Sequence, residues 1–212
     1  MPGKPARVLV LVSGSGTNLQ ALIDASRDPG YGAEIVAVGA DRTICLGLER
    51  AEKAGISTFA LRVKDFAAAA AVTPDERRAW DQALRDEVAE HSPDLVVLAG
   101  FMKLVGEDFL AEFGGRVINT HPALSPSFPG MHGPADALAY GVKVTGCTVF
   151  FVEAGVDDGP VVAQRSVSVE DDDDVESLHE RIKTAERALL ADVVGRLART
   201  GWTINERKVT LP

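Results

Sequence analysis

Short apolar runs alternate with amphipathic stretches through the first 120 residues of the chain. The runs are rich in β-branched residues, as buried strands are, whereas the stretches between them place apolar residues at helical spacing. The runs predict strands over 7–12, 34–40, 56–61, 94–100 and 116–119. The intervening stretches predict helices over 18–26, 46–55, 74–90 and 106–113. Strands that alternate with helices predict βαβ units and a parallel sheet.

The second part of the chain departs from this alternation. Four prolines between His121 and Pro134 exclude regular structure there. The pattern then predicts a short helix, two longer strands and a final helix, over 134–141, 144–154, 160–169 and 175–199. The acidic run 171–174 is expected to cap the final helix, and the tail 201–212 to form a small hairpin or an edge strand. Residues 62–72 are expected to form a loop or a marginal helix.

These elements predict an α/β fold in one domain, 1–212, with its core over about 7–200. The expected architecture is Rossmann-like, with a mostly parallel twisted sheet flanked by helices. In such sheets ligands bind outside the carboxyl ends of the strands. The segments that leave those ends are therefore the first places to look for chemistry.

Composition narrows the functional class. The 212 residues are 46% hydrophobic and 25% charged, with a net charge of −9, which is typical of a globular protein. An acidic chain without a Lys/Arg cluster predicts no nucleic-acid partner and no binding to an anionic membrane surface. Two cysteines, 102 positions apart and outside any metal-ligand spacing, argue against a disulfide scaffold and a zinc site. We expect a cytoplasmic protein with small-molecule substrates and no metal.

The first candidate motif is the glycine-rich segment after the first strand, SGSGTNLQ. Free backbone N–H groups at a helix start favour an anion, so Gly16, Thr17 and Asn18 could hold a single phosphate. The segment lacks the third glycine of a dinucleotide fingerprint and the Gly-Lys of a phosphate-binding P-loop. A tight turn into a capped helix is the alternative.

The second and third motifs carry the candidate catalytic groups. Asn119 and His121 alternate after a short strand, so both could face the same side, where an amide and an imidazole can stabilise an oxyanion and shuttle a proton. One of the two carboxylates in the turn Val156–Pro160, Asp157 or Asp158, could orient and charge the imidazole of His121. A structural histidine and a plain turn are the alternatives. No nucleophile elbow is present, so direct transfer is favoured over a covalent enzyme intermediate.

Two further features are less specific. The loop 100–106 is apolar and could support a flat heterocycle, or could continue the core. Lys183 and Glu186 stand three positions apart on the last helix, where a surface ion pair is the default expectation.

The segments SGSGTNLQ, VVLAGFMKLVG, VINTHPALSPSFPGMHG, TGCTVFFVEAGVDDGPVV and HERIKTAE occur in the order and approximate spacing of one family. Over residues 7–200 the chain resembles the phosphoribosylglycinamide formyltransferases, folate-dependent enzymes of purine synthesis. The sequence departs from the family pattern at Lys103, where Arg is frequent, at Ser125, where Leu is frequent, and at Phe150, where His is frequent.

The resemblance implies a role for each matching residue. Asn119, His121 and Asp157 match the catalytic set, and the substrate-binding positions are Gly16, Thr17, Asn18, Lys183 and Glu186. The folate-binding positions are Arg77, Met102, Lys103, Leu104, Val105, Asn119, Glu153, Ala154, Gly155, Val156 and Asp157.

The reaction that the resemblance implies is formyl transfer from 10-formyltetrahydrofolate, the cosubstrate, to the amine of 5-phosphoribosylglycinamide. A formyltetrahydrofolate hydrolase and a methionyl-tRNA formyltransferase share the core, but each usually carries an additional domain. A non-catalytic phosphosugar or nucleotide sensor would need the glycine loop alone. A homodimer is the candidate assembly, although no specific sequence signal points to it.

Overall fold

The computed structural model describes residues 4–67 and 71–212. By their contacts the residues divide into two compact units, one that runs to Val117 and one from Ile118 to Pro212. The expected loop or marginal helix at 62–72 is in part a 3₁₀ helix, η2 (Val63–Phe66), and its positions 68–70 lie outside the described residues.

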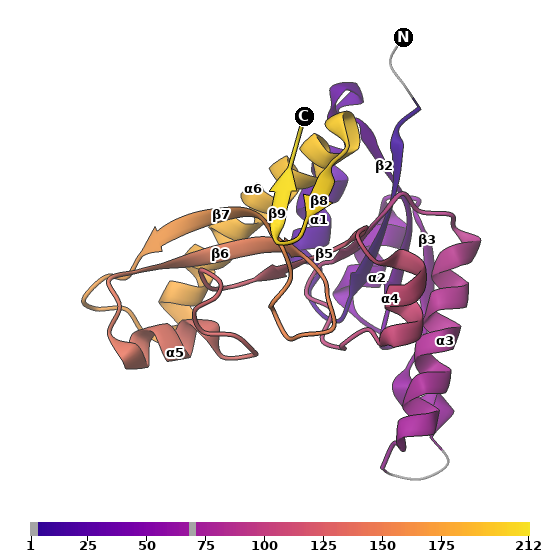
Figure 1. Ribbon diagram of the computed structural model, residues 1–212, viewed down its shortest axis with the longest axis horizontal. Helices are drawn as coiled ribbons and strands as arrows, with labels where there is room; N and C mark the ends of the chain where they lie inside the picture. Colours follow the sequence, from indigo (N-terminus) through magenta and orange to yellow (C-terminus); the bar gives the residue numbers. More distant parts are fainter. Residues whose placement is uncertain (1–3, 68–70) are drawn as a thin grey trace. The chain divides into compact units, whose positions relative to one another are not determined.

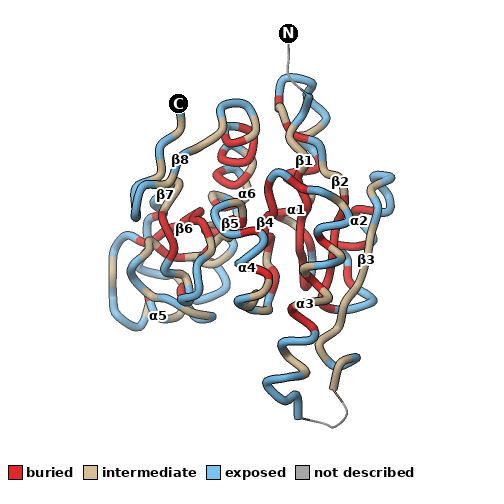
Figure 2. Tube along the Cα trace, turned by 45° about the vertical axis from the view of Figure 1, so that its right-hand side comes forward, coloured by how far each residue is buried: buried red, intermediate tan, exposed pale blue. Residues whose placement is uncertain are grey.

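Four parallel strands form the sheet of the first unit (Figure 1). In the order β3-β2-β1-β4 they are Ser57–Ala60, Ala33–Ala40, Ala6–Val12 and Leu95–Leu98. β1 pairs on both sides, with Val10 opposite Val38 of β2 and opposite Val97 of β4. The central position explains the continuous apolar run of β1, because a strand that is covered on both faces needs apolar residues at every position. Figure 2 shows β1 largely in red, as buried.

Helices connect these strands, and they contact one another in two pairs, α1 with α2 and α3 with α4. Their bounds are Thr17–Ala25 for α1, Leu46–Lys53 for α2, Pro74–Glu90 for α3 and Glu107–Phe113 for α4, with a short 3₁₀ helix, η1, at Pro29–Tyr31. The expected start of α3 is confirmed: Thr73 and Glu76 form a reciprocal capping box, with Pro74 in the first turn. Trp80 and Leu84 of α3 and Phe109 of α4 are buried in the core.

The second unit is built on antiparallel pairing. β6 (Val144–Phe151) pairs with β5 (Val117–His121) on one side and with β7 (Val161–Ser168) on the other. The long helix α6 (Val175–Thr200) contacts β6 and β7, and α5 (Gly133–Tyr140) contacts α6. The tail forms the small hairpin that was one of its two expected forms, with β8 (Thr203–Asn205) and β9 (Lys208–Thr210).

Several sequence-based boundaries differ from the structure by one to three residues; the strand expected over 144–154, for example, ends at Phe151. β5 continues to His121 because its backbone pairs with β6, Asn119 opposite Phe150 and His121 opposite Thr148. Asn119 and His121 therefore lie in the strand rather than after it. α5 begins at Gly133 and includes Pro134, which is tolerated because N–H groups in a first helical turn have no intrahelical partner. The acidic run behaves as expected, since Asp174 caps α6 and accepts from Ser177 N at 2.8 Å.

Candidate active site

Asn119 and His121 are placed by the pairing of β5 with β6. Side chains two positions apart on a strand point to the same face, so the expectation that the two share one side agrees with the observed strand. His121 is only 3% exposed, and Asn119 is half-buried. A rigid, paired strand therefore holds both groups.

Both ring nitrogens of His121 have partners. Nδ1 lies 3.3 Å from Oδ2 of Asp157, and Nε2 lies 2.7 Å from the carbonyl oxygen of Phe128. A carbonyl oxygen can only accept, so Nε2 carries a proton. The carboxylate of Asp157 is also an acceptor, so Nδ1 is satisfied when it carries a proton as well. The Phe128 carbonyl thus holds Nε2, and Nδ1 is the ring nitrogen that faces the carboxylate of Asp157.

Asp157 lies in the loop between β6 and β7 and is held by the proline-rich segment that follows β5. Its Oδ2 accepts a hydrogen bond from Gly130 N at 2.8 Å, and its side chain is 13% exposed. The residue has a positive φ of 52°, and Phe128, which holds the other side of the imidazole, has a φ of 53°. Positive φ is uncommon for Asp and unusual for a bulky residue such as Phe. Strained residues of this kind cluster at functional sites.

The glycine-rich loop of the first unit ends in a left-handed residue. Gly16, at φ 67°, is the N-cap of α1, and no side chain caps this helix. A Cβ at Gly16 would stand 2.6 Å from Gly47 Cα, so glycine is required both for the conformation and for the approach of α2. Arg50 Nε donates to Ser15 O at 2.8 Å and fixes the loop from outside. The geometry fits a nest for a single anion.

The loops after β1 and β4 are tied together, as expected for the carboxyl ends of adjacent parallel strands. Met102 N donates to Ser13 Oγ at 2.7 Å, and Ser13 N donates to Gly100 O at 3.2 Å. Met102 and Leu104 are 61% and 67% exposed. Met102 and Leu104 therefore lie at the surface, whereas Phe101 of the same loop is 7% exposed and continues the core.

Arg77 and Lys103 are engaged within the first unit. Arg77 donates to the carbonyl oxygen of Leu104, and its guanidinium lies 4.3 Å from the ring centroid of Trp80. Burial lowers the pKa of this guanidinium from its usual value, and the contact brings Arg77 and the loop 102–105 together. Lys103 Nζ lies 3.9 Å from Oδ2 of Asp41, a buried carboxylate.

The remaining expected residues lie in the second unit. Glu153, Ala154, Gly155 and Val156 are exposed in the loop before Asp157. Lys183 forms its ion pair with Glu180, whereas the sequence suggested Glu186 as the default partner. Glu186 is instead 6% exposed and is one of the buried residues of α6. Its negative charge adds to the effect of burial, which is the larger cause, in raising the pKa of the Cys147 thiol to about 12.

Several residues that shape the site were absent from the sequence-based set. Ser13, Arg50 and Phe128 act through a loop contact or a main-chain carbonyl, so residue type gave no signal for them. His179 precedes Lys183 by one helical turn, and burial, followed by the charge of Lys183, lowers the pKa of its imidazole. Among residues 4–67 and 71–212, no group of three or more His, Cys, Asp or Glu could hold a metal ion. In the same part of the chain, no helix has the length and apolar character needed to cross a membrane.

Comparison with known proteins decides the family. A model of the family described as formyl transferase matches residues 6–194. The chain belongs to this family. It is 51% identical over 210 residues to a phosphoribosylglycinamide formyltransferase of Mycobacterium tuberculosis (strain H37Rv), covering 99% of this chain and 93% of that protein. It is 42% identical over 195 residues to the trifunctional purine biosynthetic protein adenosine-3 of Bos taurus, covering 92% of this chain and 18% of that protein.

The fold agrees as well. The crystal structure of glycinamide ribonucleotide transformylase 1 from Symbiobacterium toebii matches with a TM-score of 0.91 at 39% identity, covering 99% of this chain and 95% of that one. The expected α/β fold and the expected class of enzyme, a formyltransferase, are confirmed.

Proposed function

We propose that this formyltransferase moves the formyl group of 10-formyltetrahydrofolate to the amine of 5-phosphoribosylglycinamide, a step of purine biosynthesis. The contact of His121 Nδ1 with the Asp157 carboxylate, at 3.3 Å, on the strand that also carries Asn119, is the observation that carries the proposal. Relatives whose names give this activity or purine biosynthesis support it.

The chemistry follows from the two protonated nitrogens of His121. The substrate amine attacks the formyl carbon, and the formyl oxygen becomes an oxyanion. The Asn119 amide and the Nδ1–H of His121 donate to this oxygen, in the manner of an oxyanion hole. When the intermediate collapses, the bond from the formyl carbon to the folate nitrogen breaks, and the proton lost by the amine is passed to that nitrogen. Asp157 stays ionised and keeps the imidazole charged and oriented.

The ribonucleotide and the folate are assigned to separate sets of residues. The phosphate of the ribonucleotide binds at Gly16, Thr17 and Asn18, whose backbone begins α1, and Lys183 and Glu186 contact the rest of that substrate. The folate lies against Met102–Val105 and Glu153–Asp157. Arg77 is proposed to act on the folate by holding the Leu104 carbonyl, which supports the loop. Small residues at Ala154 and Gly155 leave room for a flat ring.

Three wider assignments accompany this proposal. The two compact units belong to one formyltransferase domain, which is supported by a family match that spans both, over residues 6–194. The enzyme acts in the cytoplasm, and its partners are small molecules rather than nucleic acid or membrane. A homodimer is the proposed assembly, and light scattering on the purified protein tests it directly.

The absorbance change of 10-formyltetrahydrofolate, recorded with and without glycinamide ribonucleotide, tests the reaction. Turnover that requires the ribonucleotide supports the proposal. Turnover without it indicates a hydrolase, and binding without turnover indicates a sensor.

Three variants, His121→Ala, Asp157→Asn and Asn119→Ala, test the assigned roles. Loss of one oxyanion donor typically costs about 10²–10³-fold in kcat, so we expect losses of that order with circular dichroism unchanged. His132→Ala is the matched control, because His132 is exposed and its side chain does not cap α5. A variant that keeps the wild-type rate removes its residue from the catalytic set.

A further inference from the structure

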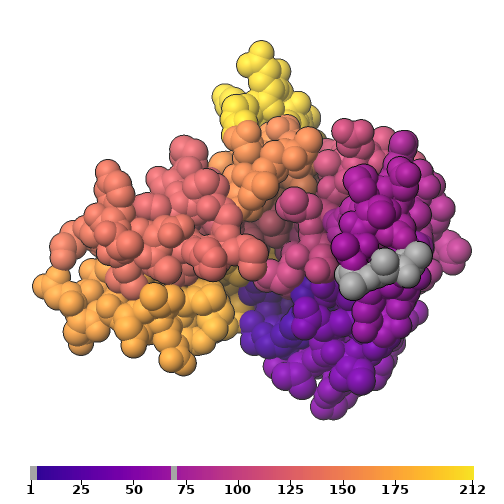
Figure 3. Space-filling model, turned by 90° about the horizontal axis from the view of Figure 1, so that it is seen from below, coloured from indigo at the N-terminus to yellow at the C-terminus, as the bar shows by residue number. Residues whose placement is uncertain are grey.

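The C-terminal hairpin lies beyond the residues that the family model matches, which end at 194. β8 and β9 pair with one another, and β9 also contacts β7. The turn between the two strands contains Glu206, at a φ of 53°, and Arg207. In Figure 3 the yellow C-terminal hairpin stands on the orange segment that leads from β6 to β7. The hairpin therefore touches the part of the second unit that carries Asp157.

Two contacts attach the hairpin there. Arg207 Nη2 donates to the main-chain carbonyl oxygen of Asp158 at 2.8 Å and lies 3.4 Å from Oδ1 of the same residue. Before β8, the ring of Trp202 lies 5.7 Å from the ring of Phe151, centroid to centroid. Phe151 is the last residue of β6, and Asp158 follows Asp157 directly. The hairpin thus holds the loop 152–160 at its beginning and near its end.

The carboxylate of Asp157 is held from outside this loop, by the hydrogen bond from Gly130 N. Residues 153–156 and 158 are exposed, and Asp157 has the uncommon positive φ described above. On the far side the chain is fixed, because Phe151 N donates to Pro160 O at 2.9 Å and a Cβ at Gly159 would stand 1.6 Å from Phe151 O. The Arg207 hydrogen bond fixes the peptide between Asp158 and Gly159. It therefore restrains the backbone immediately after the residue that contacts His121.

We infer that Arg207 is a positioning residue, which holds the loop 152–160 in the conformation that directs the Asp157 carboxylate at His121. The inference rests on the proposed function, since it acts through Asp157. The side chains of Arg207 and Asp158 are 63% and 69% exposed, so their charge pair contributes little. The hydrogen bond to the Asp158 carbonyl is the effective contact. Its loss is expected to lower kcat by about three- to tenfold.

The experiment compares Arg207→Ala, Arg207→Lys and the control Lys208→Ala in the formyl transfer assay. Lys208 neighbours Arg207 on the same hairpin and is exposed. Arg207→Ala should lower kcat with little change in KM for the ribonucleotide. Arg207→Lys, which keeps one donor, should recover part of the loss, and Lys208→Ala should match the wild type.

A double-variant cycle with Asp157→Asn separates positioning from a general structural role. If Arg207 acts through Asp157, Arg207→Ala has no further effect on kcat in the Asp157→Asn background. An equal fold-loss in both backgrounds overturns the inference, and so does a wild-type kcat for Arg207→Ala while Asp157→Asn is impaired. A fully active Asp157→Asn is a different result, because it removes the proposed role of Asp157 itself.

Discussion

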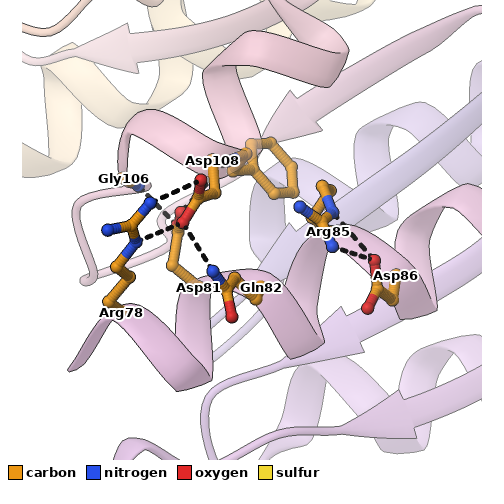
Figure 4. Close-up of polar contacts among 8 residues, drawn as sticks. Arg78, Asp81, Gln82, Arg85, Asp86, Gly106 and Asp108 are labelled. Carbon is orange, nitrogen blue, oxygen red and sulfur yellow. Dashed lines mark hydrogen bonds and ion pairs between the residues drawn. The ribbon is translucent and has the colours of Figure 1, made fainter. Parts of the chain in front are cut away.

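Asp81 of α3 offers a sharp test of how the loop 102–105 is held. α4 begins after Gly106, which has no side chain to cap the helix. The cap comes instead from Asp81, whose Oδ1 accepts from Gly106 N at 2.5 Å and whose Oδ2 accepts from Phe109 N at 3.0 Å. Asp81 is 3% exposed, and Figure 4 shows it between the two helices, close to Gly106. One buried carboxylate thus satisfies two N–H groups at the start of α4.

The magnitude follows from these two hydrogen bonds. A hydrogen bond to a charged group contributes about 1.5–3 kcal/mol to stability. Asp81→Ala loses both bonds, so we expect the free energy of unfolding to fall by about 3–6 kcal/mol, and Tm by about 6–24 °C. Asp81→Asn keeps one acceptor and turns an N–H₂ group toward an N–H donor. The Asp81→Asn change should lower the free energy of unfolding by about 1.5–3 kcal/mol.

Urea unfolding followed by circular dichroism measures these losses. Asp108→Ala is the matched control, because Asp108 lies in the first turn of α4 and pairs with Arg78, whose side chain is 70% exposed (Figure 4), and exposed ion pairs contribute little. At a temperature where Asp81→Ala is folded, its KM for the folate should rise, since Gly106 directly follows Val105. An Asp81→Ala variant as stable as Asp108→Ala would refute the reasoning.

Two further predictions concern the second unit. Gly159→Ala would place a Cβ 1.6 Å from Phe151 O, so the loop must move and kcat should fall on the order of 10²-fold; a wild-type kcat in the transfer assay would contradict this. Burial first, and the charge of Glu186 second, raise the pKa of the Cys147 thiol from 9.0 to about 12. In a Cys45→Ser background the native protein should resist a thiol reagent at neutral pH and react once unfolded in urea. The thiol of the unfolded chain loses its proton at a lower pH than the thiol of the native protein, so the free energy of unfolding should also fall as pH rises from about 9 toward 12. Rapid labelling of the native protein, or a free energy of unfolding that does not change over this pH range, would show that Cys147 is accessible.

Local signals were sufficient for the secondary structure. The apolar run of β1, the Thr73–Glu76 capping box of α3 and the Asp174 cap of α6 were all predicted, because period and capping depend on residues within a few positions of one another. The end of β5, at His121 rather than at residue 119, depended on pairing with β6, which the local pattern does not contain.

The candidate site likewise contains residues that the local sequence indicates and contacts that it does not. Asn119, His121 and Asp157 stand out by residue type, and the contact between His121 and Asp157 agrees with the sequence-based expectation. The Phe128 carbonyl that fixes Nε2, the contact of Arg77 with the Leu104 carbonyl and the Asp81 cap of α4 could not be predicted.

The sequence by itself determined the order of helices and strands, their caps and the candidate residues of the site. Tertiary structure alone decided which groups contact the ring of His121, what holds the loop 102–105 and where the hairpin attaches. The reason is that main-chain groups form most of these contacts. Every residue carries the same N–H and C=O, so only the folded chain selects which of them meets a given side chain.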